Sequence, residues 1–68
     1  GYDRVVTRRS DEKSYAVWYF RGGQLLAVDA MNDPRGYMIG KRLIEAGKSP
    51  APEVIADPET DLKALLRG

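Results

Sequence analysis

Two adjacent glycines between two apolar runs constrain the fold of this chain more than any other feature. The segment 15–20 contains six apolar or aromatic residues without a polar break, and Gly22 and Gly23 follow directly after Arg21. Glycine supplies the positive φ angles that a two-residue hairpin turn requires. The pattern predicts an antiparallel hairpin in which Phe20 lies opposite Leu25 and the pairing continues without interruption.

This register gives the hairpin two faces, and both of them are apolar. One face is expected to carry Trp18, Phe20, Leu25 and Ala27. The other is expected to carry Tyr15, Val17, Tyr19, Leu26, Val28 and Ala30. A sheet at an ordinary protein surface exposes a polar face to water. The second apolar face therefore indicates a strand that is covered on both sides.

The flanking segments predict an α+β fold. A β-branched stretch over 2–8 predicts a first strand, so the sheet is an antiparallel meander of about three strands. Asp33 and Pro34 are typical of an N-cap and a first helical position, and Gly47 is typical of a left-handed cap. They bound one main helix, whose apolar side is expected to comprise Tyr37, Ile39, Gly40, Leu43, Ile44 and Ala46.

Gly40 stands within that apolar side, where glycine costs about 1 kcal/mol of helix propensity relative to alanine. We interpret it as permitting a close approach of the helix to the sheet. Further along, 52–56 predicts a single helical turn. Asp57 and Pro58 repeat the cap-and-proline pattern and predict a short C-terminal helix, whose apolar side is expected to comprise Leu62, Leu65 and Leu66.

The composition of the chain excludes several classes of function. Its 68 residues include no cysteine and no histidine, which removes disulfides, the usual zinc ligands and the usual base near neutral pH. The net charge of +1 is too small for a general grip on nucleic acid or anionic membrane, and no apolar run spans a bilayer. The N-terminal residues do not resemble a secretion signal, so we expect a cytoplasmic protein without nucleic-acid, membrane or metal partners.

Four polar or aromatic features could carry a function, and for the first three we favour a structural interpretation. Asp29, among apolar neighbours, is expected to hydrogen-bond the adjacent turn or helix start. The four carboxylates within 53–61 match no calcium loop and suit helix first turns. The aromatic run could stack on nucleic-acid bases, but its rings fall on both faces. The basic residues of the main helix and just beyond it are a solvated face or a steering surface for an acidic partner: Arg35, Lys41, Arg42 and Lys48.

The segment 26–44 also carries a family resemblance. It reads Leu-Ala-Val-Asp-Ala-Met-Asn-Asp-Pro-Arg-Gly-Tyr-Met-Ile-Gly-Lys-Arg-Leu-Ile, and Val-Trp-Tyr-Phe-Arg-Gly-Gly precedes it. These residues and the ending over 55–66 resemble the C-terminal domain of FAD-dependent ferredoxin reductases. Those flavoproteins pass electrons from NADH or NADPH to ferredoxins of dioxygenase, cytochrome P450 and rubredoxin systems. The resemblance covers nearly the whole chain.

The resemblance implies that 1–68 is a single fragment of that domain, without its first strands and without the dinucleotide-binding domains. FAD and NAD(P)H would then bind to the parent reductase and not to this fragment, which is expected to hold no catalytic residue. The parent would pass hydride from nicotinamide to flavin, and single electrons to a ferredoxin. The alternative, from another class, is a free-standing module that binds a protein or an apolar peptide.

The resemblance also implies two sets of site residues. Tyr15, Val17 and Tyr19 are expected at the interface with the remaining reductase domains. Ferredoxins of these systems are acidic, so the expected docking contacts are basic: Lys63, Arg67 and, with less weight, Arg42. A fragment without its neighbours would expose a strand edge and an apolar patch, and we expect it to self-associate.

Overall fold

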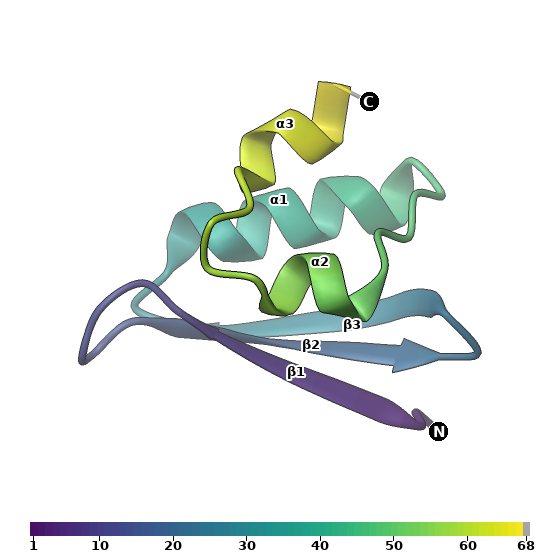
Figure 1. Ribbon diagram of the computed structural model, residues 1–68, viewed down its shortest axis with the longest axis horizontal. Helices are drawn as coiled ribbons and strands as arrows, with labels where there is room; N and C mark the ends of the chain where they lie inside the picture. The colour runs from purple at the N-terminus through teal and green to yellow at the C-terminus, as the bar shows by residue number, and fades with distance from the viewer. Residues whose placement is uncertain (68) are drawn as a thin grey trace.

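The computed structural model describes residues 1–67 and confirms an α+β fold with an antiparallel meander. The sheet has the strand order β1-β2-β3, with β1 (Arg4–Arg9), β2 (Tyr15–Arg21) and β3 (Gln24–Met31). The helices are α1 (Pro34–Glu45), α2 (Pro52–Ala56) and α3 (Leu62–Arg67). All three helices lie on one face of the sheet, and α3 is the outermost (Figure 1).

The glycine hairpin forms as predicted. Gly22 and Gly23 both have positive φ, 55° and 84°, and Phe20 pairs with Leu25. The pairing then shifts by one residue, because Tyr19 lies opposite Ala27. The uninterrupted register predicted beyond Phe20 is therefore wrong.

The shift is a β-bulge at Leu26, and it exchanges the faces of β3 beyond that point. A bulge sets two residues of one strand against one of its partner, so Leu25 and Val28 both face the helices although they are three positions apart. Val28, predicted on the face of Tyr19, is 5% exposed in the core, whereas Ala27, predicted on the face of Trp18, pairs with Tyr19 on the far side. An extra residue in a strand of period two has this consequence for every later side chain.

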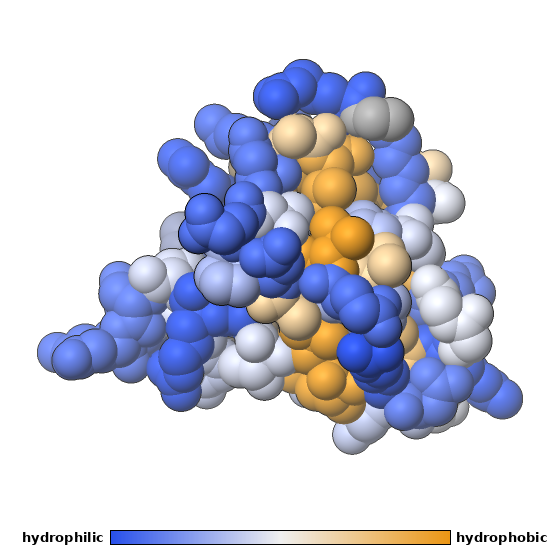
Figure 2. Space-filling view, in the orientation of Figure 1, coloured by the Kyte–Doolittle hydropathy of each residue, from blue (hydrophilic) through white to orange (hydrophobic). Residues whose placement is uncertain are grey.

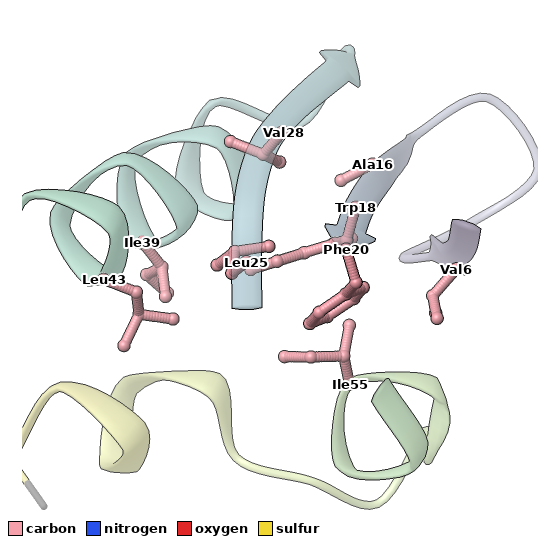
Figure 3. Packing of buried hydrophobic residues seen from close by; sticks show 9 residues of the cluster. All are labelled: Val6, Ala16, Trp18, Phe20, Leu25, Val28, Ile39, Leu43 and Ile55. Carbon is pink, nitrogen blue, oxygen red and sulfur yellow. The ribbon is translucent and has the colours of Figure 1, made fainter. Parts of the chain in front are cut away.

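The hydrophobic core lies between the sheet and the helices (Figure 3). Trp18 and Phe20 on β2 are fully buried, as are Ile39 and Leu43 on α1 and Ile55 on α2. The remaining buried members come from the strands: Val6, Ala16, Leu25 and Val28. The leucines of α3 are only partly buried against this cluster.

The main helix begins and ends as predicted. The Gly36 N–H donates to Asp33 Oδ1 at 3.0 Å, Pro34 occupies the first turn, and Gly47 has φ 71° just beyond the C-cap. Tyr37, predicted on the apolar side, is instead 45% exposed. The buried side of the helix is formed by Gly36, Ile39, Gly40 and Leu43 and does not include Tyr37.

The C-terminal segment forms the predicted short helices with one different cap. The N–H of Lys63 donates to Asp61 Oδ1 at 3.1 Å, so α3 begins at Leu62. Asp57 does not begin this helix, because its Oδ1 accepts from the N–H of Glu59 at 2.9 Å in a separate turn. The aspartate-proline pair therefore closes a turn between α2 and α3.

Candidate functional site

The three predicted interface residues lie together on the face of the sheet that the helices do not cover. Tyr15, Val17 and Tyr19 alternate along β2 with the buried Ala16 and Trp18, so they project from the opposite side. No segment within 1–67 covers this face (Figure 1). We call it the outer face, and its residues are Tyr2, Val5, Thr7, Arg9, Tyr15, Val17, Tyr19, Ala27, Asp29 and Met31.

The outer face is apolar over most of its width. Val5 lies opposite Tyr19 and is 44% exposed, and Met31 lies opposite Tyr15 and is 52% exposed. The rings of Tyr2 and Tyr19 are 4.9 Å apart between centroids at an interplanar angle of 57°. An apolar surface with aromatic residues is typical of a contact with other protein.

Asp29 is the acidic residue of the outer face, where it lies opposite Val17. It interacts with Tyr19, and not with the helix start, which Asp33 caps. Partial burial raises the pKa of the Tyr19 phenol, and the negative charge of Asp29 and a hydrogen bond to it raise that pKa further. The expectation that Asp29 serves the turn or the helix start was therefore wrong.

The predicted docking residues lie on the helical side of the molecule. Lys63 and Arg67 are one turn apart on α3, both exposed, so their side chains occupy the same side of that helix. Arg42 is exposed on α1, the helix against which α3 packs. Figure 2 shows apolar surface in the middle of this view, with hydrophilic residues on both sides of it.

Arg8 is a structural residue of this region that the sequence analysis did not single out. Its guanidinium donates to the carbonyl oxygens of Ile55 at 3.0 Å, Asp57 at 2.6 Å and Thr60 at 2.8 Å. Arg8 therefore connects β1 to the segment between α2 and α3. The alternation of side chains along the strand could have predicted that Arg8 faces the helices. Val6 faces the core, and Arg8, two positions later, must face the same side.

Lys63 also lines a surface cleft of about 360 Å³ where β1 ends, α1 begins and the α2–α3 connection passes. Arg8, Arg9 and Arg35 line the same cleft. The guanidinium of Arg9 itself lies over the Tyr15 ring, on the outer face. Arg35 and Lys63 come to the cleft from separate parts of the chain, and the sequence analysis had named both without placing them together.

Neither a metal centre nor a membrane segment emerges from the described residues. Within 1–67, no three acidic side chains come together in a way that could hold a metal ion. No helix in that range combines the length and apolarity needed to cross a membrane.

Comparison with known proteins identifies the family. The family described as Reductase C-terminal matches residues 1–66. Putidaredoxin reductase of Pseudomonas putida is 31% identical, a ferredoxin–NAD(P)(+) reductase of a Sphingomonas species 38% identical, and rhodocoxin reductase of Rhodococcus erythropolis 34% identical. Each similarity covers 97% of this chain and 16% of the relative, so the chain spans about a sixth of their length. With nearly all of its residues matched, the chain belongs to the family of reductase C-terminal domains that ferredoxin reductases contain.

Proposed function

We propose that this chain is part of an FAD-dependent NAD(P)H:ferredoxin reductase of the cytoplasm, in which it supports the flavin-bearing body and contributes to the docking of ferredoxin. The observation that carries the proposal is the one-sided sheet: the helices cover one face, and the other exposes an apolar surface built around Tyr15, Val17 and Tyr19. The family match over 1–66 supports the same assignment.

In this proposal the outer face packs against the rest of the reductase. The relatives are about six times longer than the part that this chain matches, so ample polypeptide is present in them to cover it. The strands β1 and β3 are the edges of the described sheet, and the first strands of the domain would extend it. The outer face then becomes an interior contact between domains.

The residues of this chain do not fit FAD itself. A dinucleotide pyrophosphate needs a glycine-rich turn from a strand into a helix, with free N–H groups at the helix N-terminus. Here the glycine pair joins two strands, and the turn from β3 into α1 holds the carboxylate of Asp33 against the Gly36 N–H. The proposal therefore assigns FAD and NAD(P)H to other parts of the reductase, and no chemical step to this chain.

Docking of ferredoxin is assigned to the exposed cations of α3. Lys63 and Arg67 share one side of this outermost helix, and Arg42 is exposed on the helix beneath it. An exposed positive surface raises the rate of encounter with an acidic protein, although each exposed ion pair stabilises the complex only slightly.

The test is a charge reversal in the full-length reductase. Replacing Lys63 and Arg67 with glutamate is expected to raise the KM for ferredoxin by about tenfold, with unchanged reduction of a small dye such as ferricyanide. Arg21→Glu, at the β2–β3 hairpin, is the matched control and should leave both reactions unchanged. Equal losses with ferredoxin and dye would contradict the docking assignment.

A further inference from the structure

Two charged side chains belong to the outer face, and they differ in how far the described chain engages them. Arg9 and Asp29 lie on the two edge strands, β1 and β3, with β2 between them. The guanidinium of Arg9 lies 5.2 Å from the centre of the Tyr15 ring and donates to the Glu12 carbonyl at 3.2 Å. Asp29 is exposed and forms no ion pair with any residue of 1–67.

The neighbours of Asp29 on the outer face are apolar or aromatic. They lie opposite it, diagonally across from it on β2 and on either side of it along β3: Val17, Tyr15, Tyr19, Ala27 and Met31. The phenol of Tyr19 donates a hydrogen bond to the carboxylate, which satisfies one of its acceptor positions and leaves its negative charge in place. A carboxylate therefore stands within an apolar surface, and no cation of the described chain lies beside it.

A segment that covers the outer face would remove this carboxylate from water. A buried carboxylate without a cationic partner opposes the contact, whereas a basic side chain placed against it offsets the loss of hydration. The apolar residues around Asp29 exclude water, and the attraction between opposite charges is stronger there than at an exposed site. The covering segment therefore needs a positive charge opposite Asp29.

We propose that the outer face binds an apolar segment of the reductase outside this chain that presents a basic side chain to Asp29. This inference rests on the proposed function, in which the rest of the reductase covers the outer face, and it adds the chemistry of the covering segment. The relatives contain ample polypeptide for this role, because this chain matches only 16% of their length. Arginine fits best, since its planar guanidinium can pair with both oxygens of Asp29 and stack on the Tyr19 ring, as Arg9 does on Tyr15.

The test measures how fast a cysteine on the outer face reacts with N-ethylmaleimide in the full-length reductase, with mass spectrometry to locate the label. Val5→Cys is the reporter, because Val5 lies on β1, across the sheet from Asp29. Asp29→Asn is expected to speed the labelling by about tenfold or more, because the basic side chain opposite it would be left buried and unpaired. Asp29→Glu retains the charge and is expected to keep most of the protection. Asp29→Thr repeats the neutral change should the asparagine variant fold poorly.

Glu45→Gln is the matched control. It removes the same charge from the exposed end of α1, on the helical side of the molecule, and is expected to leave the labelling of Val5→Cys unchanged (Figure 1). The same cysteine in reductase unfolded with urea gives the labelling rate of an uncovered position.

The outcomes separate this inference from the proposed function. If Val5→Cys is protected and Asp29→Asn labels at the same rate or more slowly, the outer face is covered without a basic side chain at Asp29. The inference then fails and the proposed cover stands. If Val5→Cys labels as fast in the folded as in the unfolded reductase, the outer face is open and both fail. Protection that is lost on dilution would identify a second copy of the protein as the occupant and would overturn the inference.

Discussion

The backbone of Gly40 lies so close to Val28 that no side chain at position 40 would fit between them. A Cβ at position 40 would lie 2.6 Å from Cγ1 and 2.9 Å from Cβ of Val28, well inside van der Waals contact. Val28 is 5% exposed and faces α1 because of the bulge at Leu26. The glycine that weakens the propensity of α1 is thus the residue that lets the helix pack directly on β3, as its place in the sequence predicted.

Gly40→Ala is expected to destabilise the domain although alanine is the better helix former. Alanine contributes about 1 kcal/mol of helix propensity, whereas forcing a methyl group against a buried, β-branched valine costs about 1–3 kcal/mol. We expect a net loss of about 1 kcal/mol in the free energy of unfolding, measured with urea.

The double variant Gly40→Ala, Val28→Ala distinguishes this contact from a general effect on the helix. Truncation of Val28 leaves space that the alanine methyl partly fills, so the two changes should cost less together than the sum of their separate effects. Strict additivity would mean that the close approach of position 40 to Val28 does not limit stability.

Arg8→Met should loosen the connection between α2 and α3. It removes three hydrogen bonds from a charged donor to the carbonyl oxygens of Ile55, Asp57 and Thr60, while it retains most of the aliphatic length. We expect a loss of about 1–3 kcal/mol, because these bonds are only partly buried. Hydrogen exchange should rise in α3 more than in the strands.

Arg21→Met is the control for Arg8→Met. Arg21 is exposed at the end of β2, and its removal should change the free energy of unfolding by less than about 0.5 kcal/mol. Similar losses in the two variants would show that Arg8 contributes through nonspecific charge and not through its three carbonyl partners.

The sequence predicted those parts of the fold that depend on local chemistry. A glycine pair that requires positive φ specified the hairpin, and Asp33 with Pro34 specified the start of α1. The residues around the bulge at Leu26 do not mark it, because Leu25, Leu26 and Ala27 are all apolar. Asp29 carried the signal, since the uninterrupted register would have placed its carboxylate opposite the buried Ala16 on the core face. The bulge also sets Val28 against Gly40, a contact that exists only after the helix has folded onto the sheet.

Of the two candidate surfaces, one could be predicted from the sequence and the other could not. Tyr15, Val17 and Tyr19 were predictable as a group since a strand repeats every two residues. The cleft that Arg35 and Lys63 line was not, because these two residues are far apart in the sequence and meet only through the packing of α1 and α3.

Asp29→Asn is expected to lower the pKa of Tyr19 toward its ordinary value of 10.0. Partial burial keeps part of the increase, while the negative charge of Asp29 disappears with the substitution. The pKa of Tyr19 is higher in the folded state than in the unfolded state. The contribution of the protonated Tyr19 phenol to stability is therefore complete below its pKa in the unfolded state, and it is lost as the pH rises through its pKa in the folded state. Ultraviolet titration of the phenolates measures the change, with Tyr19→Phe to identify the Tyr19 signal. An unchanged titration in Asp29→Asn would rule out the interaction.

Val17→Lys should separate the fold of the isolated 1–68 chain from its association. Val17 lies near the middle of the outer face and opposite Asp29, so a lysine there gains a cross-strand acidic neighbour and is tolerated by the sheet. In the isolated chain we expect copies to associate through the outer face, and a lysine in that contact should weaken the association by about tenfold or more. Sedimentation equilibrium measures this change.

Val54→Lys places the same charge on α2, where Val54 is 37% exposed, and should leave association intact. A chain that stays monomeric at high concentration, or a Val54→Lys variant that dissociates equally, would mean that the outer face does not drive association, and the apolar surface around Tyr15 and Tyr19 would then need another occupant.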